Sequence, residues 1–346
     1  MTDLVPTITD ISDAALAARL QSALDNKTKP LGALGRLEAL ALRIGSILDT
    51  DKPVLEAPQM LVCAGDHGLA ARGVSAYPSE VTWQMVENFL AGGAAVSVLA
   101  RQHGLALTVV DCGVRQDFQP RPGLVSRRIA AGTADASAGP AMTAEQCAQA
   151  IANGREVVKA LPGNALLLGE MGIGNSSSAA LLLSRLGGLD IDACIGIGTG
   201  LDAAGLARKR EVLRQVLALH AGATAPLDAL AAFGGFELAT LVGAVLQAAA
   251  ERRVIVVDGY IASAAVLVAQ ALQPHVVQRC VAAHRSAEPG HALMLERLGL
   301  DPLLQLDLRL GEGSGGALAW PLLESACRIL REMASFESAG VSRKDA

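Results

Sequence analysis

The sequence predicts an α/β fold, in which a parallel sheet carries helices on both of its faces. Short apolar runs of strand length recur through the middle of the chain, and each is followed by glycine or an acidic residue. Alanine-rich stretches of helical length separate these runs. Strands that are apolar throughout are typical of sheets buried on both faces, and parallel neighbours need crossovers of this length. Residues 53–304 are therefore expected to form one large, Rossmann-like domain.

The expected strands and helices alternate along this domain. The strands are expected at residues 60–64, 105–110, 165–168, 193–197 and 254–257. The helices between them are expected at residues 80–102, 143–161, 176–186, 203–220 and 236–250. In open parallel sheets, ligands bind beyond the carboxyl ends of the strands. The glycine and acidic residues that follow the strands therefore mark the candidate binding site.

Both ends of the chain are expected to be helical. Helical periodicity extends over residues 13–26, 34–48, 292–298 and 317–333. We expect the first two helices and the last one to pack together as a small helical domain, formed by residues 1–52 and 305–346. The polar residues 335–346 are expected to fray.

The composition excludes several classes of protein. The net charge is -5 and no dense run of lysine and arginine occurs, so a nucleic-acid partner is not expected. The six cysteines are scattered without a C-x-x-C pair, which favours buried thiols over disulfides or a zinc site. The first residues lack a secretory signal, and apolar runs such as residues 239–250 are shorter than the roughly 20 residues that a membrane helix needs. We therefore expect a soluble, cytoplasmic protein without a membrane partner.

The sharpest candidate for a catalytic group is Glu312. It lies in the segment Leu310-Gly311-Glu312-Gly313-Ser314, where small residues surround one carboxylate just before an expected helix. The positive end of that helix is expected to lower the pKa of Glu312 and keep it ionised as a base. The alternative is a glycine-rich turn with an exposed glutamate. A dinucleotide site is excluded because no second strand follows, and a serine elbow is excluded because G-x-S-x-G would need glycine at position 312.

Two further glycine-rich loops follow expected strands. Glu170 begins the first, and the free amides and hydroxyls of residues 172–178 could hold a phosphate or a ribose. Asn175 or a following serine could instead only cap the next helix. The second loop covers residues 196–202, and Lys209 beyond it could neutralise a phosphate, although a surface lysine on a helix is the commoner case.

Two histidines also follow strand-like segments. Asp66 and His67 invite a metal or acid–base interpretation, but a lone Asp–His pair without further ligands is more often structural. Asp258 and His284 belong to similar segments, and His284 is either a ligand contact or a buried histidine with ordinary partners. The sequence offers no convincing metal site, and we expect neither a metal nor a cofactor.

Taken together, these segments resemble the nicotinate-nucleotide–dimethylbenzimidazole phosphoribosyltransferase family of cobalamin nucleotide-loop assembly. The similarity runs in order over most of the chain, which is more specific than any single glycine motif. The family-like blocks are KPLGALGRLE (29–38), AGDHG (64–68), VVDCGV (109–114), GEMGIGNSS (169–177), FGGFEL (233–238), VVDGY (256–260), HRSAEPG (284–290) and RLGEGSG (309–315).

The resemblance assigns roles to particular residues. It implies that Glu312 is the catalytic base and that Glu170 supports it or contacts substrate. The flat base is expected in an apolar slot formed by Tyr77, Met85 and Leu310. Further substrate-binding residues are Gly172, Gly174, Asn175, Ser176, Gly198, Thr199, Gly200, Lys209, Asp258, Ser286 and Gly311. Tyr77 and Met85 stand where some family members carry smaller or more polar residues, which leaves the preferred base open.

The function that the resemblance implies is a phosphoribosyl transfer. It moves the phosphoribosyl group of nicotinate mononucleotide to 5,6-dimethylbenzimidazole or a related base, which gives α-ribazole 5'-phosphate and nicotinate. The family resemblance also implies a homodimer. One alternative is a nucleotide-using transferase or hydrolase of the same fold with another acceptor, including water. Another is a non-catalytic nucleotide sensor, which would bind the ligand without turnover.

Overall fold

The computed structural model describes residues 4–342, and a six-stranded parallel sheet lies at its centre. The strand order is β3-β2-β1-β4-β5-β6, and every neighbouring pair is parallel. The strands are β1 (Gln59–Gly65), β2 (Ala106–Gly113), β3 (Leu124–Ser126), β4 (Ala165–Met171), β5 (Val254–Val257) and β6 (Cys280–Ala282). The predicted α/β fold with a parallel sheet is confirmed.

The order of the strands places a crevice beside β1. The chain first adds β2 and β3 on one side of β1, and it then crosses over to add β4, β5 and β6 on the other. The direction of winding therefore reverses between β1 and β4. In sheets of this kind, such a reversal separates the loops at the carboxyl ends of the strands and opens a binding crevice there.

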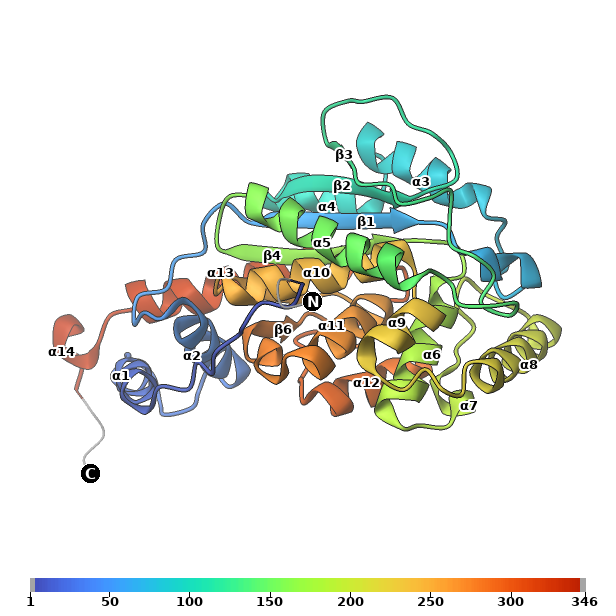
Figure 1. The fold of residues 1–346 in the computed structure, drawn as a ribbon. Coiled ribbons are helices and arrows are strands. Elements are labelled where there is room, and N and C mark those ends of the chain that lie inside the picture. The colour runs from blue at the N-terminus through green and yellow to red at the C-terminus, as the bar shows by residue number, and fades with distance from the viewer. Residues whose placement is uncertain (1–3, 343–346) are drawn as a thin grey trace.

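Helices cover both faces of the sheet, and each face has its own hydrophobic core (Figure 1). Alternate side chains of β1 point to opposite faces: Leu61 and Cys63 pack into one core, and Met60 and Val62 into the other. The first core contains α5 (Ala144–Ala160), α6 (Asn175–Gly187), α9 (Pro226–Phe233), α10 (Phe236–Ala250) and α11 (Tyr260–Leu272). The second contains α1 (Ala14–Asp25), α2 (Arg36–Leu48), α3 (Glu80–Ala91), α4 (Ala95–His103) and α13 (Ser314–Glu332).

The remaining helical elements complete the described chain. They are η1 (Gly68–Arg72), α7 (Ile191–Cys194), α8 (Ala203–Leu219), η2 (Pro274–Arg279), α12 (Pro289–Leu298) and α14 (Phe336–Ala339). Within residues 4–342, no helix combines the length and the apolar character needed to cross a bilayer.

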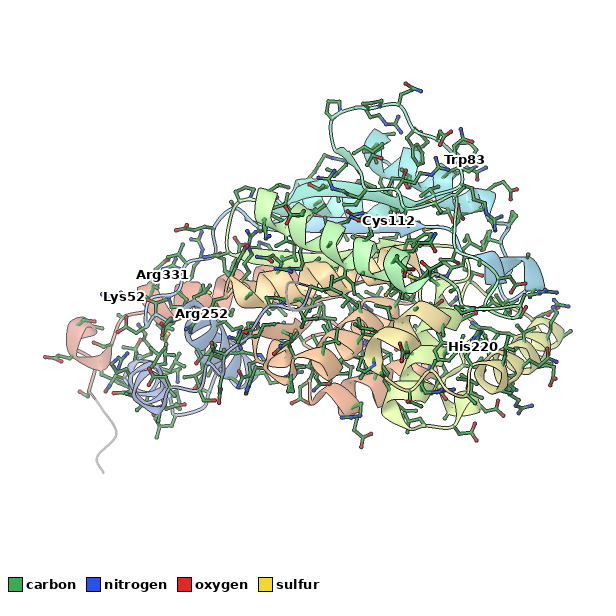
Figure 2. The ribbon with its side chains drawn as sticks, viewed as in Figure 1. Lys52, Trp83, Cys112, His220, Arg252 and Arg331 are labelled. Atoms are coloured by element: carbon green, nitrogen blue, oxygen red, sulfur yellow. The ribbon has the colours of Figure 1, made fainter. Side chains whose placement is uncertain are left out.

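Helices from both ends of the chain lie beside one another. Figure 1 shows α1, α2 and the far end of α13 gathered at one end of the molecule, opposite α7 and α8. The guanidinium of Arg252 donates to the carbonyls of Ser46 (2.8 Å) and Ile47 (2.9 Å), which joins the end of α2 to the segment before β5 (Figure 2). Because α2 and α13 share a core with the sheet, the division into two domains stays a prediction.

The structure corrects three of the predicted elements. Residues 193–197 are not a strand: they begin within α7, which Asp190 caps, and they do not pair to the sheet. Cys194 and Ile195 are buried in the core, whereas Ile197 is 39% exposed. The predicted helix 80–102 is two helices, because Gly92 adopts a left-handed conformation (φ 81°) and ends α3. The segment expected to fray forms α14, capped by Ser335, whereas residues 343–346 lie outside the described chain.

Candidate active site

A cavity of about 390 Å³ opens at the carboxyl ends of the strands. The segments after β4, β5 and β6 form its base, and α3 and the segment before α13 form its sides. It is lined by thirteen of the residues predicted to form the site: Tyr77, Met85, Glu170, Gly172, Gly174, Asn175, Ser176, Gly198, Thr199, Ser286, Leu310, Gly311 and Glu312. The structure therefore brings together residues that the sequence separates by more than 200 positions.

Glu312 is buried in the wall of this cavity, with 5% of its surface exposed. Burial and the charge of Asp258 raise its pKa to about 7, while a hydrogen bond from the Val96 amide acts in the opposite direction. The expected lowering of this pKa is therefore wrong, because desolvation outweighs the favourable helix end. Glu312 Oε2 has no hydrogen-bond partner among the described residues. A carboxyl with a free oxygen and a pKa near neutrality is well suited to accept a proton.

Glu170 lies at the end of β4, directly beside the Glu312 segment. Burial raises its pKa to about 8; the Asn175 amide, which donates to Glu170 Oε2 at 2.5 Å, opposes this shift, and nearby carboxylates add to it. Gly311 allows the Glu312 segment to lie this close to Glu170, since a Cβ at position 311 would lie 2.4 Å from Glu170 Oε1. Gly311 also has a positive φ of 80°, which favours glycine.

Lys209 lies behind the glycine loops and does not line the cavity. It is fully buried, and its Nζ donates to Ser176 Oγ (3.0 Å) and to the Gly196 carbonyl (3.3 Å). Burial lowers its pKa to about 8, and the charge of Glu288 opposes that shift. Gly200 likewise lies outside the lining. Lys209 thus braces the two predicted phosphate loops from beneath.

Comparison with known proteins identifies the family to which the chain is similar. Residues 9–341 match the model of a family described as phosphoribosyltransferase. A protein from Variovorax paradoxus (strain S110) named nicotinate-nucleotide–dimethylbenzimidazole phosphoribosyltransferase is 88% identical over 99% of this chain and 98% of its own length. A protein of the same name from Cupriavidus necator is 61% identical over 97% of this chain and 98% of its own length. The crystal structure of CobT from Thermus thermophilus superimposes with a TM-score of 0.93 at 44% identity, covering 95% of this chain and all of that one.

The chain belongs to this phosphoribosyltransferase family. The family resemblance drawn from the ordered sequence blocks is thereby confirmed.

Thr199 joins two walls of the phosphoribosyltransferase cavity. Its hydroxyl is 3.0 Å from Ser75 Oγ and accepts a hydrogen bond from the Ala76 amide at 3.0 Å. This contact fixes the segment that carries Tyr77, which is 55% exposed. Thr199 therefore connects the predicted phosphate loop to the predicted base slot.

Two charged residues of the cavity were absent from the predicted site. Arg309 lines the cavity and donates to the Gly198 carbonyl at 3.0 Å. Glu288 is 6% exposed; burial raises its pKa, while the charge of Lys209 lowers it. Its Oε2 has no hydrogen-bond partner among the described residues. Both belong to family-like blocks, but nothing in their spacing marks the direction of the side chain.

Asp258 and His67 lie near the cavity but outside its lining. Asp258 contacts the first turn of α13 and not the cavity space, although it was predicted to bind substrate. His67 Nε2 lies 2.7 Å from Glu237 Oε1, and its Nδ1 lies 3.2 Å from Ser178 Oγ. Gly172 packs against this ring, where a Cβ would lie 3.3 Å from the imidazole. The pair therefore supports the loop that follows β4.

Proposed function

We propose that this phosphoribosyltransferase transfers the phosphoribosyl group of nicotinate mononucleotide to 5,6-dimethylbenzimidazole or a related flat base, with Glu312 as general base. The products are α-ribazole 5'-phosphate and nicotinate. The observation that carries the assignment is the Glu312 carboxyl, which lines the cavity, keeps one oxygen without a partner among the described residues and has a pKa of about 7. The names of the most similar relatives support the choice of substrates.

The chemistry of the two rings explains why one base suffices. The ring nitrogen of nicotinate mononucleotide is quaternary and positive. When the glycosidic bond breaks, nicotinate leaves with this nitrogen uncharged, so its departure needs no general acid. The attacking benzimidazole carries a proton on its second nitrogen, and the product would be cationic unless that proton were removed. A carboxylate within hydrogen-bond reach of this nitrogen removes it. Attack from the face opposite the leaving nicotinate converts the β-linkage into an α-linkage.

Glu170 stabilises positive charge at the reacting carbon. The transition state has oxocarbenium character, and a carboxylate beside it lowers the barrier. With a pKa of about 8, Glu170 holds its proton at neutral pH when no cation lies nearby. The positive ring of nicotinate mononucleotide lowers that pKa and favours ionisation where the negative charge is needed.

The cavity walls divide the substrates between two regions. On one side, the amides and hydroxyls of the two glycine loops, together with Arg309, offer donors to a phosphate. Lys209 holds these loops in place. Tyr77, Met85 and Leu310 form the apolar side, where a flat ring can pack. Holding both rings in line across one ribose is a task of positioning, which alone contributes a large share of the rate.

The decisive test is Glu312→Gln with a product assay read by mass. We expect the variant to fold and to lose turnover by roughly 10²–10⁴-fold, because a neutral amide does not accept the proton. Glu324→Gln, on α13 but outside the cavity, is the matched control. Near-parental turnover of Glu312→Gln would remove Glu312 from the role of base.

The same assay tests the substrates. The parent enzyme is incubated with nicotinate mononucleotide, with and without a panel of benzimidazoles, purines and phenols. Release of nicotinate without any base would indicate a hydrolase, and binding without release would indicate a sensor. Formation of a riboside phosphate only when a base is present supports the transferase.

A homodimer and a cytoplasmic location complete the proposal. The family resemblance supports the homodimer, and the scattered cysteines, which are typical of a reducing compartment, support the location. Sedimentation equilibrium of the 35.5 kDa chain should give twice that mass for a dimer, and a monomeric mass over the working concentration range would contradict it. Fractionation of cells that produce the chain tests the location.

A further inference from the structure

Helix α13, which follows Glu312, begins without a cap of its own. Its N-cap residue is Gly313, which has no side chain to accept a hydrogen bond from the first turn. Asp258, in the loop after β5, accepts these hydrogen bonds instead: Oδ2 accepts from the Gly313 amide at 3.2 Å, and Oδ1 accepts from the Gly316 amide at 2.9 Å. The amides at the start of a helix need such acceptors, and a carboxylate is also favoured there by the helix dipole.

The Asp258 carboxylate faces His284 on its other side. His284 Nε2 lies 3.5 Å from Asp258 Oδ1, and both residues are 2% exposed. Gly315 lets the helix sit directly on this pair, since a Cβ there would lie 2.0 Å from His284 Cδ2 and 2.8 Å from Asp258 Oδ1. His284 lines the cavity, whereas Asp258 does not. Asp258 therefore acts on the site through the α13 turn.

We propose that Asp258 is the positioning residue of Glu312. Its carboxylate clamps the two amides at the start of α13 and thereby fixes the turn that directs Glu312 into the cavity wall. Glu312 has a positive φ of 67°, a conformation that only a restrained non-glycine residue keeps. This inference rests on the proposed role of Glu312 as base.

The charge of Asp258 also makes Glu312 a stronger base. Burial is the main reason that the pKa of Glu312 is raised, and the Asp258 charge adds to it. The other ionisable groups around Glu312 come from each neighbouring segment: Glu170 on β4, His284 after β6, Glu288 before α12 and Arg309 before Glu312 itself. Removing the Asp258 charge alone should therefore lower the pKa of Glu312 without returning it to an ordinary value.

The test compares Asp258→Asn with Asp111→Asn in the full-length enzyme. Asparagine keeps the shape of Asp258, but its NH₂ group faces an amide that it cannot satisfy. Asp111 is the matched control, because it also lies at a strand end, is 3% exposed and accepts two backbone amides, those of Gly113 (3.1 Å) and Val114 (2.9 Å). Both variants are assayed with nicotinate mononucleotide and dimethylbenzimidazole from pH 5.5 to 9.

We expect kcat of Asp258→Asn to fall by roughly 10²-fold, as a misplaced reacting group does, with the KM for the nucleotide changed by less than about threefold. The acid limb of kcat should move to lower pH by roughly 0.5–1 unit. Asp111→Asn should keep the parental pH profile. A raised nucleotide KM with unchanged kcat would overturn the proposal and make Asp258 a substrate contact, and an unchanged kcat and pH profile would overturn it as well.

A direct titration separates this inference from the role of Glu312 as base. Carbon-13 NMR of protein labelled at the glutamate carboxyls, with the Glu312 signal identified by its loss in Glu312→Gln, follows Glu312 without any turnover. A lower titration midpoint in Asp258→Asn supports the coupling even if Glu312 is not the base, and an identical midpoint overturns it. If the asparagine variant does not fold, Asp258→Ser, which keeps a hydroxyl acceptor, goes through the same measurements.

Discussion

His67 and His284 both follow a strand of the sheet, and each lies beside a buried carboxylate, but their surroundings differ. His67 is closed on both sides: Nε2 lies 2.7 Å from Glu237 and Nδ1 lies 3.2 Å from Ser178. His284 is looser: Nε2 lies 3.5 Å from Asp258, Nδ1 has no partner among the described residues, and the ring lines the cavity. The His67–Glu237 pair uses its hydrogen bonds to hold loops together. In the His284–Asp258 pair, the imidazole keeps a nitrogen available for a hydrogen bond at the cavity.

The difference separates a pair that stabilises the fold from a group of carboxyls that is suited to catalysis. Burial alone would lower the pKa of His67, but the charge of Glu237 and their hydrogen bond outweigh it, so the pKa is raised. Glu237 therefore favours the protonated form of His67, and the two groups neutralise each other when His67 carries its proton. Around the cavity, Glu170, Glu312 and Asp258 gather without a matching number of cations, and the two glutamates have raised pKa values. Such uncompensated burial costs stability and is typical of functional sites.

The largest expected effect comes from breaking the hydrogen-bonded pair of His67 and Glu237. Glu237→Ala removes the charge and the hydrogen-bond partner that offset the burial of His67, and the free energy of unfolding should fall by roughly 3–5 kcal/mol. Urea unfolding at pH 6 measures it, with the exposed Glu337→Ala as control. A loss below about 1 kcal/mol would mean that the pair is not a structural clamp and that the contrast with His284 does not hold.

The next effect concerns the carboxyls around the cavity and depends on pH, because the pKa of Glu170 changes on folding. The folded-state pKa of Glu170 is about 8, above its ordinary value of 4.5, so folding favours the protonated form. Its burial therefore costs no ionisation energy below pH 4.5, and stability is lost progressively as the pH rises from about 4.5 to about 8. Glu170→Gln removes this loss and should stabilise the protein by roughly 3–5 kcal/mol at pH 9 but not at pH 4.

Thermal unfolding of Glu170→Gln and parent across that range provides the measurement. Glu296→Gln, on the surface of α12, is the control. Equal melting temperatures of parent and Glu170→Gln at pH 9 would contradict the raised pKa. The same variant should turn over more slowly, which would show stability and activity opposed at one residue.

The sequence predicted the sheet and the gathering of residues at its edge, because strand-length apolar runs and their following glycines are local signals. It failed at residues 193–197, where Cys194 and Ile195 enter a core without pairing to the sheet and Ile197 is exposed. It could not place Lys209 beneath the loops or Asp258 beneath α13, because both depend on how distant segments pack. The raised pKa of Glu312 escaped it for the same reason, since desolvation belongs to the assembled cavity.

A smaller effect is expected from Lys209→Ala. This change removes the donor that braces Ser176 and Gly196, so the phosphate loops should loosen. We expect the KM for nicotinate mononucleotide to rise by about tenfold, which corresponds to roughly 1.4 kcal/mol, and the KM for the base to change less. Lys159→Ala, an exposed lysine on α5, is the control. Equal increases in both KM values would argue against a role at the phosphate.

The smallest expected effect comes from Tyr77→Ala, which changes the apolar side of the cavity and leaves the charged side intact. Tyr77 is 55% exposed, so its ring contributes only part of its surface to a bound base, and Tyr77→Ala should raise the KM for dimethylbenzimidazole by about threefold to fivefold. Leu306→Ala is the matched control, because Leu306 is 54% exposed but does not line the cavity. The KM for the nucleotide and the pH profile should stay parental, since Tyr77 carries no charge near Glu312. A change in the pH profile would mean that the wall also controls the solvation of the carboxyl cluster, and the two sides of the cavity would then be coupled.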